Sequence, residues 1–172
     1  MSADPLRDPA PLIRRVYAYV AYRIGEGPEA EDVTSATFER ALRYRNTYDP
    51  GRGEPVGWLL GIARRCIGDL RPPDVHLDDD DQYKVAEDFA PEAERRIVLA
   101  QLVSTLDQRD RELVALRYGA DLSARQIARI MDMRTNAVEV ALHRALGRLR
   151  AELAEDPARD PAVEPEPRTE TR

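Results

Sequence analysis

Residues 123–150 read SARQIARIMDMRTNAVEVALHRALGRLR, and their pattern decides what kind of fold to expect. Ser123 and Gln126 have the spacing of a capping box, in which a serine hydroxyl accepts a hydrogen bond from an amide three residues on while the glutamine side chain reaches back. Leu122 and Ile127 have the spacing of the hydrophobic staple that accompanies such a box. The sequence therefore predicts that a short helix begins here.

A turn and a second helix follow. Asp132 lies where a tight turn requires a residue that tolerates a left-handed conformation, and aspartate does so better than most residues other than glycine. Two short helices joined by a turn of three or four residues form a helix-turn-helix, whose second helix lies in the major groove of DNA. The second helix is expected to start near Arg134–Thr135, with apolar residues at helical spacing: Val138, Leu142, Ala145, Leu146, Leu149 and Leu153.

An ordinary helical hairpin inside a bundle fits this spacing equally well. The residues expected on the outward face favour DNA binding, because few acidic side chains occur among them. That face carries Arg125, Arg134, Asn136, His143, Arg144, Arg148 and Arg150.

The distribution of charge supports this interpretation although the net charge of the chain is −6. Residues 11–71, the first block, hold ten arginines and eight acidic residues, and residues 91–154, the second block, hold eleven arginines and nine acidic residues. Residues 72–90 hold seven acidic residues and one lysine. For DNA binding, what matters is whether basic residues cluster on one face, so the global charge does not exclude it.

Composition excludes several other classes. One cysteine, Cys66, rules out an internal disulfide and a thiolate zinc cluster. No run of about eighteen apolar residues is present, so we expect no membrane insertion, and the polar first ten residues do not resemble a signal peptide. We expect a cytoplasmic all-α protein, with two small helical domains (11–71 and 91–154), an acidic flexible linker (72–90) and a disordered tail (155–172).

Apolar spacing and helix-boundary residues place the remaining helices. Three helices are expected in the first block, at residues 12–24, 28–44 and 56–70, with a loop at 49–55. In the third helix, at residues 56–70, Asp69 can pair with Arg65 one turn back. Trp58 of the same helix is expected in the core. In the second block, Pro91 restarts a helix, and Asp107 caps another that Gly119 ends.

With both blocks defined, the sequence resembles an extracytoplasmic-function (ECF) sigma factor of bacterial RNA polymerase. The first block resembles sigma region 2 in PEAEDVTSATFERAL (28–42) and WLLGIARRCIGD (58–69). The second resembles region 4 in LDQRDRELVALRYGADLSARQIARIMDM (106–133) and ALHRALGRLR (141–150). The resemblance covers about three quarters of the chain, in the family's order.

The resemblance implies a role for each part of region 2. The helix at 28–42 would bind the clamp helices of the largest polymerase subunit through Glu31, Asp32, Phe38 and Arg40. From the sequence alone, its acidic residues could equally be surface residues that complement the helix dipole. The loop at 49–57 would capture a base flipped out of the promoter −10 element. Contacts to the −10 region are expected from Arg52, Gly53, Arg64, Arg65 and Arg71.

Region 4 would bind the flap of the polymerase and recognise the −35 element. Where the family's recognition helix usually carries Lys-Ser-Arg, this chain has Glu139, Val140 and Ala141, so we expect an unusual −35 preference or little reliance on −35. Arg65 stands where the family commonly has Asn, so −10 recognition is also expected to differ. The residues implied in −35 contact are Arg125, Arg134, Thr135, Asn136, Glu139, Val140, His143 and Arg144.

Three alternatives remain open. A helix-turn-helix regulator would bind duplex DNA without core polymerase, and a sequestration protein would have lost its promoter contacts. An enzyme has little support, because there is no glycine-rich phosphate loop and no cysteine–histidine pair. A metal site from Asp78–Asp81 with His76 lacks the spacing of a carboxylate cage. We expect no cofactor and no small-molecule substrate, and the family implies an anti-sigma protein as a possible partner.

Overall fold

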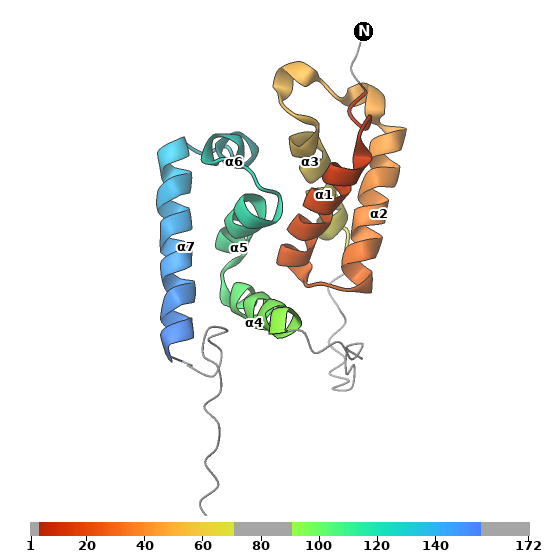
Figure 1. Cartoon of the computed structure of the whole chain (residues 1–172). Coiled ribbons are helices and arrows are strands. Elements are labelled where there is room, and N and C mark those ends of the chain that lie inside the picture. Colours follow the sequence, from red (N-terminus) through yellow and green to blue (C-terminus); the bar gives the residue numbers. More distant parts are fainter. Residues whose placement is uncertain (1–3, 71–90, 156–172) are drawn as a thin grey trace, which may run out of the picture.

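The computed structural model describes residues 4–70 and 91–155, and within these residues every regular element is helical (Figure 1). In the first block, α1 (Pro9–Ile24), α2 (Pro28–Arg43) and α3 (Pro55–Gly68) form a bundle, with short 3₁₀ turns η1 (Arg45–Thr47) and η2 (Pro50–Arg52) between α2 and α3. The second block contains α4 (Pro91–Thr105), α5 (Gln108–Val114), the π-helical segment η3 (Ala115–Gly119), α6 (Ala124–Met131) and α7 (Thr135–Glu155). The all-α fold is confirmed.

The predicted helix boundaries agree with the structure to within a few residues. Pro28 is the first residue of α2, and the Asp107 carboxylate accepts a hydrogen bond from the Asp110 amide at 2.8 Å, which caps α5. The helix that begins at Asp107 widens into η3, where the Ala120 amide donates to the Ala115 carbonyl at 3.0 Å. Gly119 ends this segment, as predicted.

Two predictions about single side chains were wrong. Asp69 does not pair with Arg65 in the structure but with Arg40 of α2, at 2.8 Å. The reason is tertiary packing, because α2 and α3 lie against each other and bring the Arg40 guanidinium to the end of α3. Trp58 packs against the core without entering it, and it is only partly buried.

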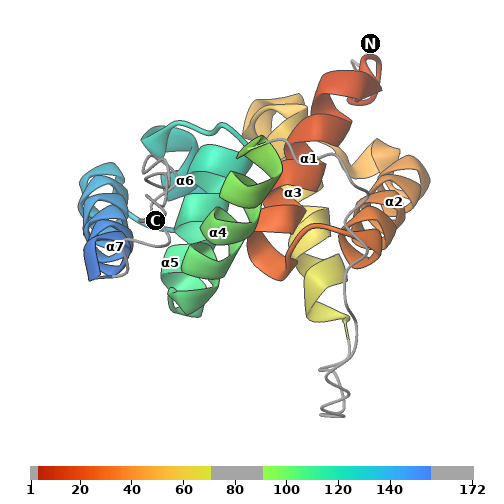
Figure 2. The ribbon, with the colours of Figure 1, turned by 60° about the horizontal axis from the view of Figure 1, so that its bottom comes forward.

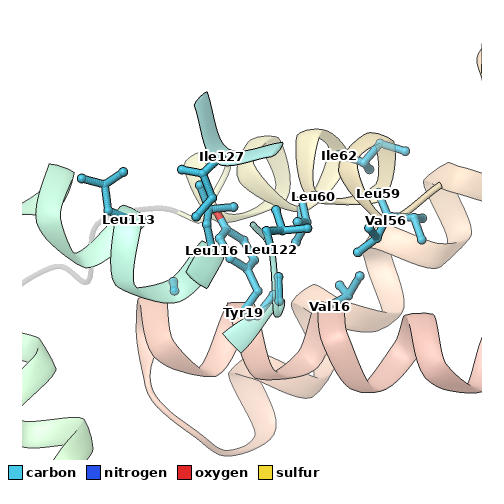
Figure 3. Packing of buried hydrophobic residues seen from close by; sticks show 14 of the residues in the cluster. Val16, Tyr19, Val56, Leu59, Leu60, Ile62, Leu113, Leu116, Leu122 and Ile127 are labelled. Atoms are coloured by element: carbon cyan, nitrogen blue, oxygen red, sulfur yellow. The ribbon is translucent and has the colours of Figure 1, made fainter. Parts of the chain in front are cut away.

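The two blocks share one hydrophobic core. Figure 3 shows Tyr19 and Val16 of α1 next to Leu116 and Leu122 of the second block. All four side chains are at most 1% exposed. A smaller cluster joins α4, α5 and α7, and Tyr22 of α1 packs against it. The periodicity predicts two helical units but not this contact between them.

Helix α7 is the most remote element from the first block. In Figure 1 and in the turned view of Figure 2, α5 and α6 lie between α7 and α1–α3. The outer face of α7 is therefore open to solvent, and the helix-turn-helix is not enclosed inside a single bundle. The expected linker at 72–90 and the tail from 156 onward lie outside the described residues, as does Arg71.

Candidate nucleic-acid interface

The helix-turn-helix has the local geometry that its sequence predicts. The Ser123 hydroxyl accepts from the Gln126 amide at 3.3 Å, and the Gln126 side chain accepts from the Ser123 amide at 2.9 Å. Asp132 adopts the left-handed conformation, with φ 53° and ψ 51°. Ile127 and Val138 are both fully buried, which fixes α6 against α7.

The outward face of α7 presents a continuous set of polar side chains. Asn136, Glu139, His143 and Arg144 are exposed, and Val140 adds an apolar side chain that is 51% exposed. Arg125 of α6 and Arg134 in the turn are also exposed, while Thr135 at the start of α7 is partly buried. The eight residues implied in −35 contact thus have side chains at the surface of one motif.

Arg148 was expected on the same face, but it is held by acidic side chains of the second block. It forms ion pairs with Asp110 and, at 3.5 Å, with Asp107. The Asp110 backbone amide, together with Arg148, holds the pKa of the Asp107 carboxyl below its usual value. Arg148 therefore ties α7 to the start of α5.

The loop between α2 and α3 forms a cavity together with α6. The cavity has a volume of about 370 Å³, within the range of roughly 300–1,000 Å³ that is typical of small-ligand sites. Gly53 has a φ of 141°, which glycine adopts readily, and the Tyr48 hydroxyl donates to its carbonyl at 2.9 Å. On the other wall are Leu122, Gln126, Arg129 and Ile130.

Aromatic side chains line this cavity, and sequence reasoning missed one of them. Tyr48 and Trp58 contact each other with their ring centroids 5.6 Å apart, and both border the cavity. Trp58 therefore combines a packing role with exposure to the loop cavity. Arg52 is exposed at the rim.

The arginines of α3 lie in different environments. Arg65 is exposed and available to a ligand. Arg64 instead points toward the second block, where its Nε lies 3.2 Å from the Glu112 carboxylate and its Nη1 donates to the Ile130 carbonyl at 3.4 Å. The structure thus separates two residues that the sequence places side by side.

The implied polymerase-binding residues lie along α2. Glu31 and Asp32 are exposed in its first turns, and Phe38 packs partly against the core of the first block. Arg40 is partly exposed and engaged by Asp69. Large apolar side chains at the end of the helix were not predicted as part of this face: Leu42 is 60% exposed and Tyr44 is 52% exposed.

A polar cluster that the sequence analysis missed joins the two blocks. The Glu112 carboxylate is bound by Arg23 at 2.5 Å and by Arg64, and it accepts a hydrogen bond from the Tyr19 hydroxyl at 2.9 Å. Burial, and then the Glu112 charge, raise the pKa of Tyr19 far above its usual value. A sequence signal existed, since Glu112 lies one helical turn before Leu116 and so shares its buried face.

Two comparisons of the sequence with known families agree with the structure. Residues 11–71 match the family described as Sigma-70 region 2, and residues 96–149 match Sigma-70, region 4. These two matches define the protein class as sigma-70-like, with one region in each block.

Individual relatives narrow the class. The chain is 33% identical over 140 residues to the ECF RNA polymerase sigma factor BldN of Streptomyces coelicolor, covering 76% of this chain but 53% of BldN. It is 30% identical over 166 residues to the ECF RNA polymerase sigma factor SigD of Mycobacterium tuberculosis, covering 86% of this chain and 76% of SigD. The chain belongs to the ECF family of RNA polymerase sigma factors.

A solved structure has the same fold. CnrH, in complex with the cytosolic domain of CnrY, superimposes with a TM-score of 0.61 at 22% identity, covering 87% of this chain and 84% of CnrH. Among residues 4–70 and 91–155, no helix has both the length and the apolar character needed to cross a membrane.

Proposed function

We propose that this chain binds core RNA polymerase and directs it to specific promoters, with recognition and melting of the −10 element by the first block and −35 binding by the second. The observation that carries the proposal is the occurrence of regions 2 and 4 in order, each on a folded helical unit. A helix-turn-helix regulator that acts without polymerase is not favoured, because such a regulator has no need of region 2.

Polymerase binding is assigned to the exposed face of α2. Glu31 and Asp32 supply a charged rim and Phe38 an apolar centre, which is the usual composition of a protein interface. Arg40, already paired with Asp69, is positioned at the end of this face. We assign this surface to the clamp helices of the largest subunit, and the second block to the flap.

The −10 element is assigned to the α2–α3 loop and to α3. A flipped base requires a pocket and stacking partners, and the loop cavity supplies both, with Trp58 and Tyr48 in its lining. Gly53 has no side chain, so a nucleotide can approach its backbone closely. The cation of Arg52 suits contact with the phosphate. Arg65 extends this surface, and Arg64 joins it once it is released from Glu112. Arg71 stays a candidate from the sequence alone.

The −35 element is assigned to α7 and the residues just before it. Asn136 suits adenine, and Arg134 and Arg144 suit guanine or phosphate. Glu139 can accept from the amino group of cytosine, and Val140 can contact a thymine methyl group. These residues are the basis for an unusual −35 preference.

The polymerase face is tested by co-purification with core enzyme. Glu31→Lys combined with Asp32→Lys should lower the affinity for core polymerase by at least about tenfold, because two rim charges are reversed. Asp4→Lys combined with Asp8→Lys reverses two exposed acids outside α2 and is the matched control. Unchanged binding of the double variant would remove α2 from the interface, and absence of wild-type binding would reject the function.

The proposal also covers what the chain acts with. It catalyses no covalent step itself and uses no cofactor. Its site of action is the cytoplasm, because core polymerase and DNA are found there. An anti-sigma protein remains a candidate partner, and the solved complex of CnrH with the cytosolic domain of CnrY supports looking for one.

A further inference from the structure

A groove runs between α5 and the outward face of α7. Its volume is about 530 Å³, and Asn136, Val140 and Arg144 of α7 line one wall. These three residues belong to the set that the proposed function assigns to the −35 element. The other wall includes Asp107, the cap of α5, and Asp110 in the first turn of that helix. The groove therefore borders the proposed recognition surface directly.

Arg148 belongs to the same stripe of α7. Residues four positions apart on a helix lie on one face, so Arg148 follows Val140 and Arg144 along the groove. It lines the groove with them, and its side chain is 53% exposed. By its position, Arg148 is a cation within reach of whatever occupies the groove.

The length of α7 determines which part of DNA Arg148 could reach. Residues 136 and 148 are twelve positions apart, which corresponds to about 18 Å along the axis at roughly 1.5 Å per residue. The major groove of B-form DNA is only about 12 Å wide. When the first residues of α7 lie against base edges, Arg148 therefore lies at the level of the sugar-phosphate backbone. Its natural ligand there is a phosphate, which a guanidinium can bind through two parallel hydrogen bonds.

Two carboxylates already occupy this guanidinium in the structure. Arg148 forms an ion pair with Asp110, and its Nη1 lies 3.5 Å from an Asp107 carboxylate oxygen. The Asp110 side chain is only 8% exposed, which fixes its position, whereas the Asp107 side chain is 60% exposed. Carboxylates and phosphates bind the same donors of a guanidinium. A phosphate that approached Arg148 would therefore have to displace these two acids.

The next arginine along the stripe is not held in this way. Within residues 4–70 and 91–155, Arg144 forms no ion pair with an acidic side chain. The cap of α5 does not explain the charge at Asp107, because a cap requires an acceptor oxygen, which asparagine supplies equally well. The two negative charges thus have their clearest effect on Arg148.

We propose that Asp107 and Asp110 compete with DNA for Arg148: they hold its guanidinium in place of a phosphate and so remove one backbone contact from the −35 interface. The occupant assigned to the groove is one sugar-phosphate strand of duplex DNA. The inference rests on the proposed function for the assignment of α7 to DNA. Its consequence is a weaker dependence of binding on salt than the arginines of α7 would otherwise give.

The test measures binding of the full chain to a pool of randomised duplex DNA at several salt concentrations, because phosphate contacts do not depend on sequence. Asp107→Asn combined with Asp110→Asn removes both competing charges and keeps an acceptor for the cap. At 100 mM salt this variant should bind about eightfold more tightly than wild type, with a logarithmic salt slope steeper by about 0.9, the effect of one phosphate contact.

The control makes the same change in net charge elsewhere. Asp8→Asn combined with Asp121→Asn alters two exposed acids that do not line the groove, and asparagine tolerates the left-handed conformation of Asp121. This control should stay close to wild type. Circular dichroism checks that the chains are folded. If the first variant is not, Asp107→Asn alone should give a smaller gain in the same direction.

A third variant tests whether the gain belongs to Arg148. Arg148→Gln added to Asp107→Asn and Asp110→Asn should return both the affinity and the salt slope close to the wild-type values, because the released guanidinium is then missing. Arg144→Gln in the wild-type chain is the reference for the loss of one phosphate contact, and it should make the slope shallower by about 0.9.

Two results would overturn the inference. One is equal binding and equal salt slope in the Asp107→Asn, Asp110→Asn chain and the control, and absence of binding by both counts as this result. The other is a triple variant that keeps the full gain without Arg148. Neither result involves polymerase, so a failure of the proposed function is recognised separately, by the absence of transcripts when core enzyme and promoter DNA are supplied.

Discussion

Tyr19 shows how one side chain connects the sequence to the arrangement of the blocks. Its hydroxyl donates to Glu112 from a fully buried position, and its pKa is raised above the ordinary value of 10.0, first by burial and then by the Glu112 charge. Folded Tyr19 thus keeps its proton at pH values where the unfolded chain has lost it. Its contribution to stability is complete below about pH 10 and falls as the pH rises further.

Alkaline unfolding therefore depends on Tyr19. We expect the free energy of unfolding to fall above pH 10 by up to about 1.4 kcal/mol per pH unit from this residue. Tyr19→Phe should be less stable than wild type at pH 8 but should show a shallower decline between pH 10 and 11. Urea titrations at these pH values provide the measurement, and an unchanged slope in Tyr19→Phe would contradict the assignment.

Ser123 tests the start of the helix-turn-helix at the same scale. Ser123→Ala removes the acceptor for the Gln126 amide and should lower the free energy of unfolding by about 1 kcal/mol. Ser35→Ala, at an exposed position within α2, should leave stability equal or slightly higher, because alanine is a better helix former than serine. Equal losses in both variants, measured by urea unfolding, would argue against the cap.

The residue scale also shows what local sequence can and cannot predict. Ser123, Asp107 and Asp132 were predicted correctly because caps and left-handed turns depend on a few adjacent residues. Asp69 was assigned to Arg65 because only neighbours on one helix are visible in a sequence, whereas its partner Arg40 comes from a different helix. The partners of Glu112 could not be predicted for the same reason, although its place on a buried face follows from Leu116 one turn on.

At the scale of elements, α7 carries the departure from the family pattern. Glu139 is exposed on its outward face and Ala141 is partly buried, so the proposed recognition surface has an acid and a methyl group at the two positions where the family pattern has Lys and Arg. Each lost phosphate contact reduces the dependence of binding on salt, with a slope of about 0.9 per contact. The helix is thus expected to rely little on phosphate attraction.

Glu139→Lys restores a cation to this face. The variant should bind duplex −35 DNA more tightly than wild type and show a steeper salt dependence, by about 0.9 in the logarithmic slope for one added phosphate contact. Glu39→Lys makes the same change in net charge, but on α2 instead of α7, and therefore serves as the control. The measurement is the binding constant for duplex −35 DNA between 50 and 200 mM salt. Identical slopes of binding against salt for Glu139→Lys and Glu39→Lys would place Glu139 away from the DNA.

Elements were predicted well, and their mutual placement was not. Periodicity located the helices of both blocks because apolar spacing is a local property. The shared core depends on Gly119 and Ala120 meeting Tyr19, about a hundred positions earlier in the sequence. Gly119 was interpreted only as a helix end, although its lack of a side chain also allows the backbone of α1 to approach.

On the scale of the whole molecule, the structure combines an α7 whose outward face is exposed with a partly covered first block. Helices α7 and α2 lie at opposite sides of the molecule (Figure 1), and the outward residues of α7 and the acidic residues Glu31 and Asp32 of α2 are exposed. Arg64 and the loop cavity lie between the blocks. Sequence resemblance predicts a −10 surface on α3 and the α2–α3 loop, but only the packing shows that the second block covers part of it.

The central claim, that this chain confers promoter specificity, is tested most directly with a promoter library. Purified core polymerase is incubated with randomised −10 and −35 sequences, with and without the chain, and the transcripts are sequenced. The account predicts start sites that appear only when the chain is present and share a −10 motif, with a −35 motif that is weak or unlike the family consensus. Identical transcripts with and without the chain would contradict it.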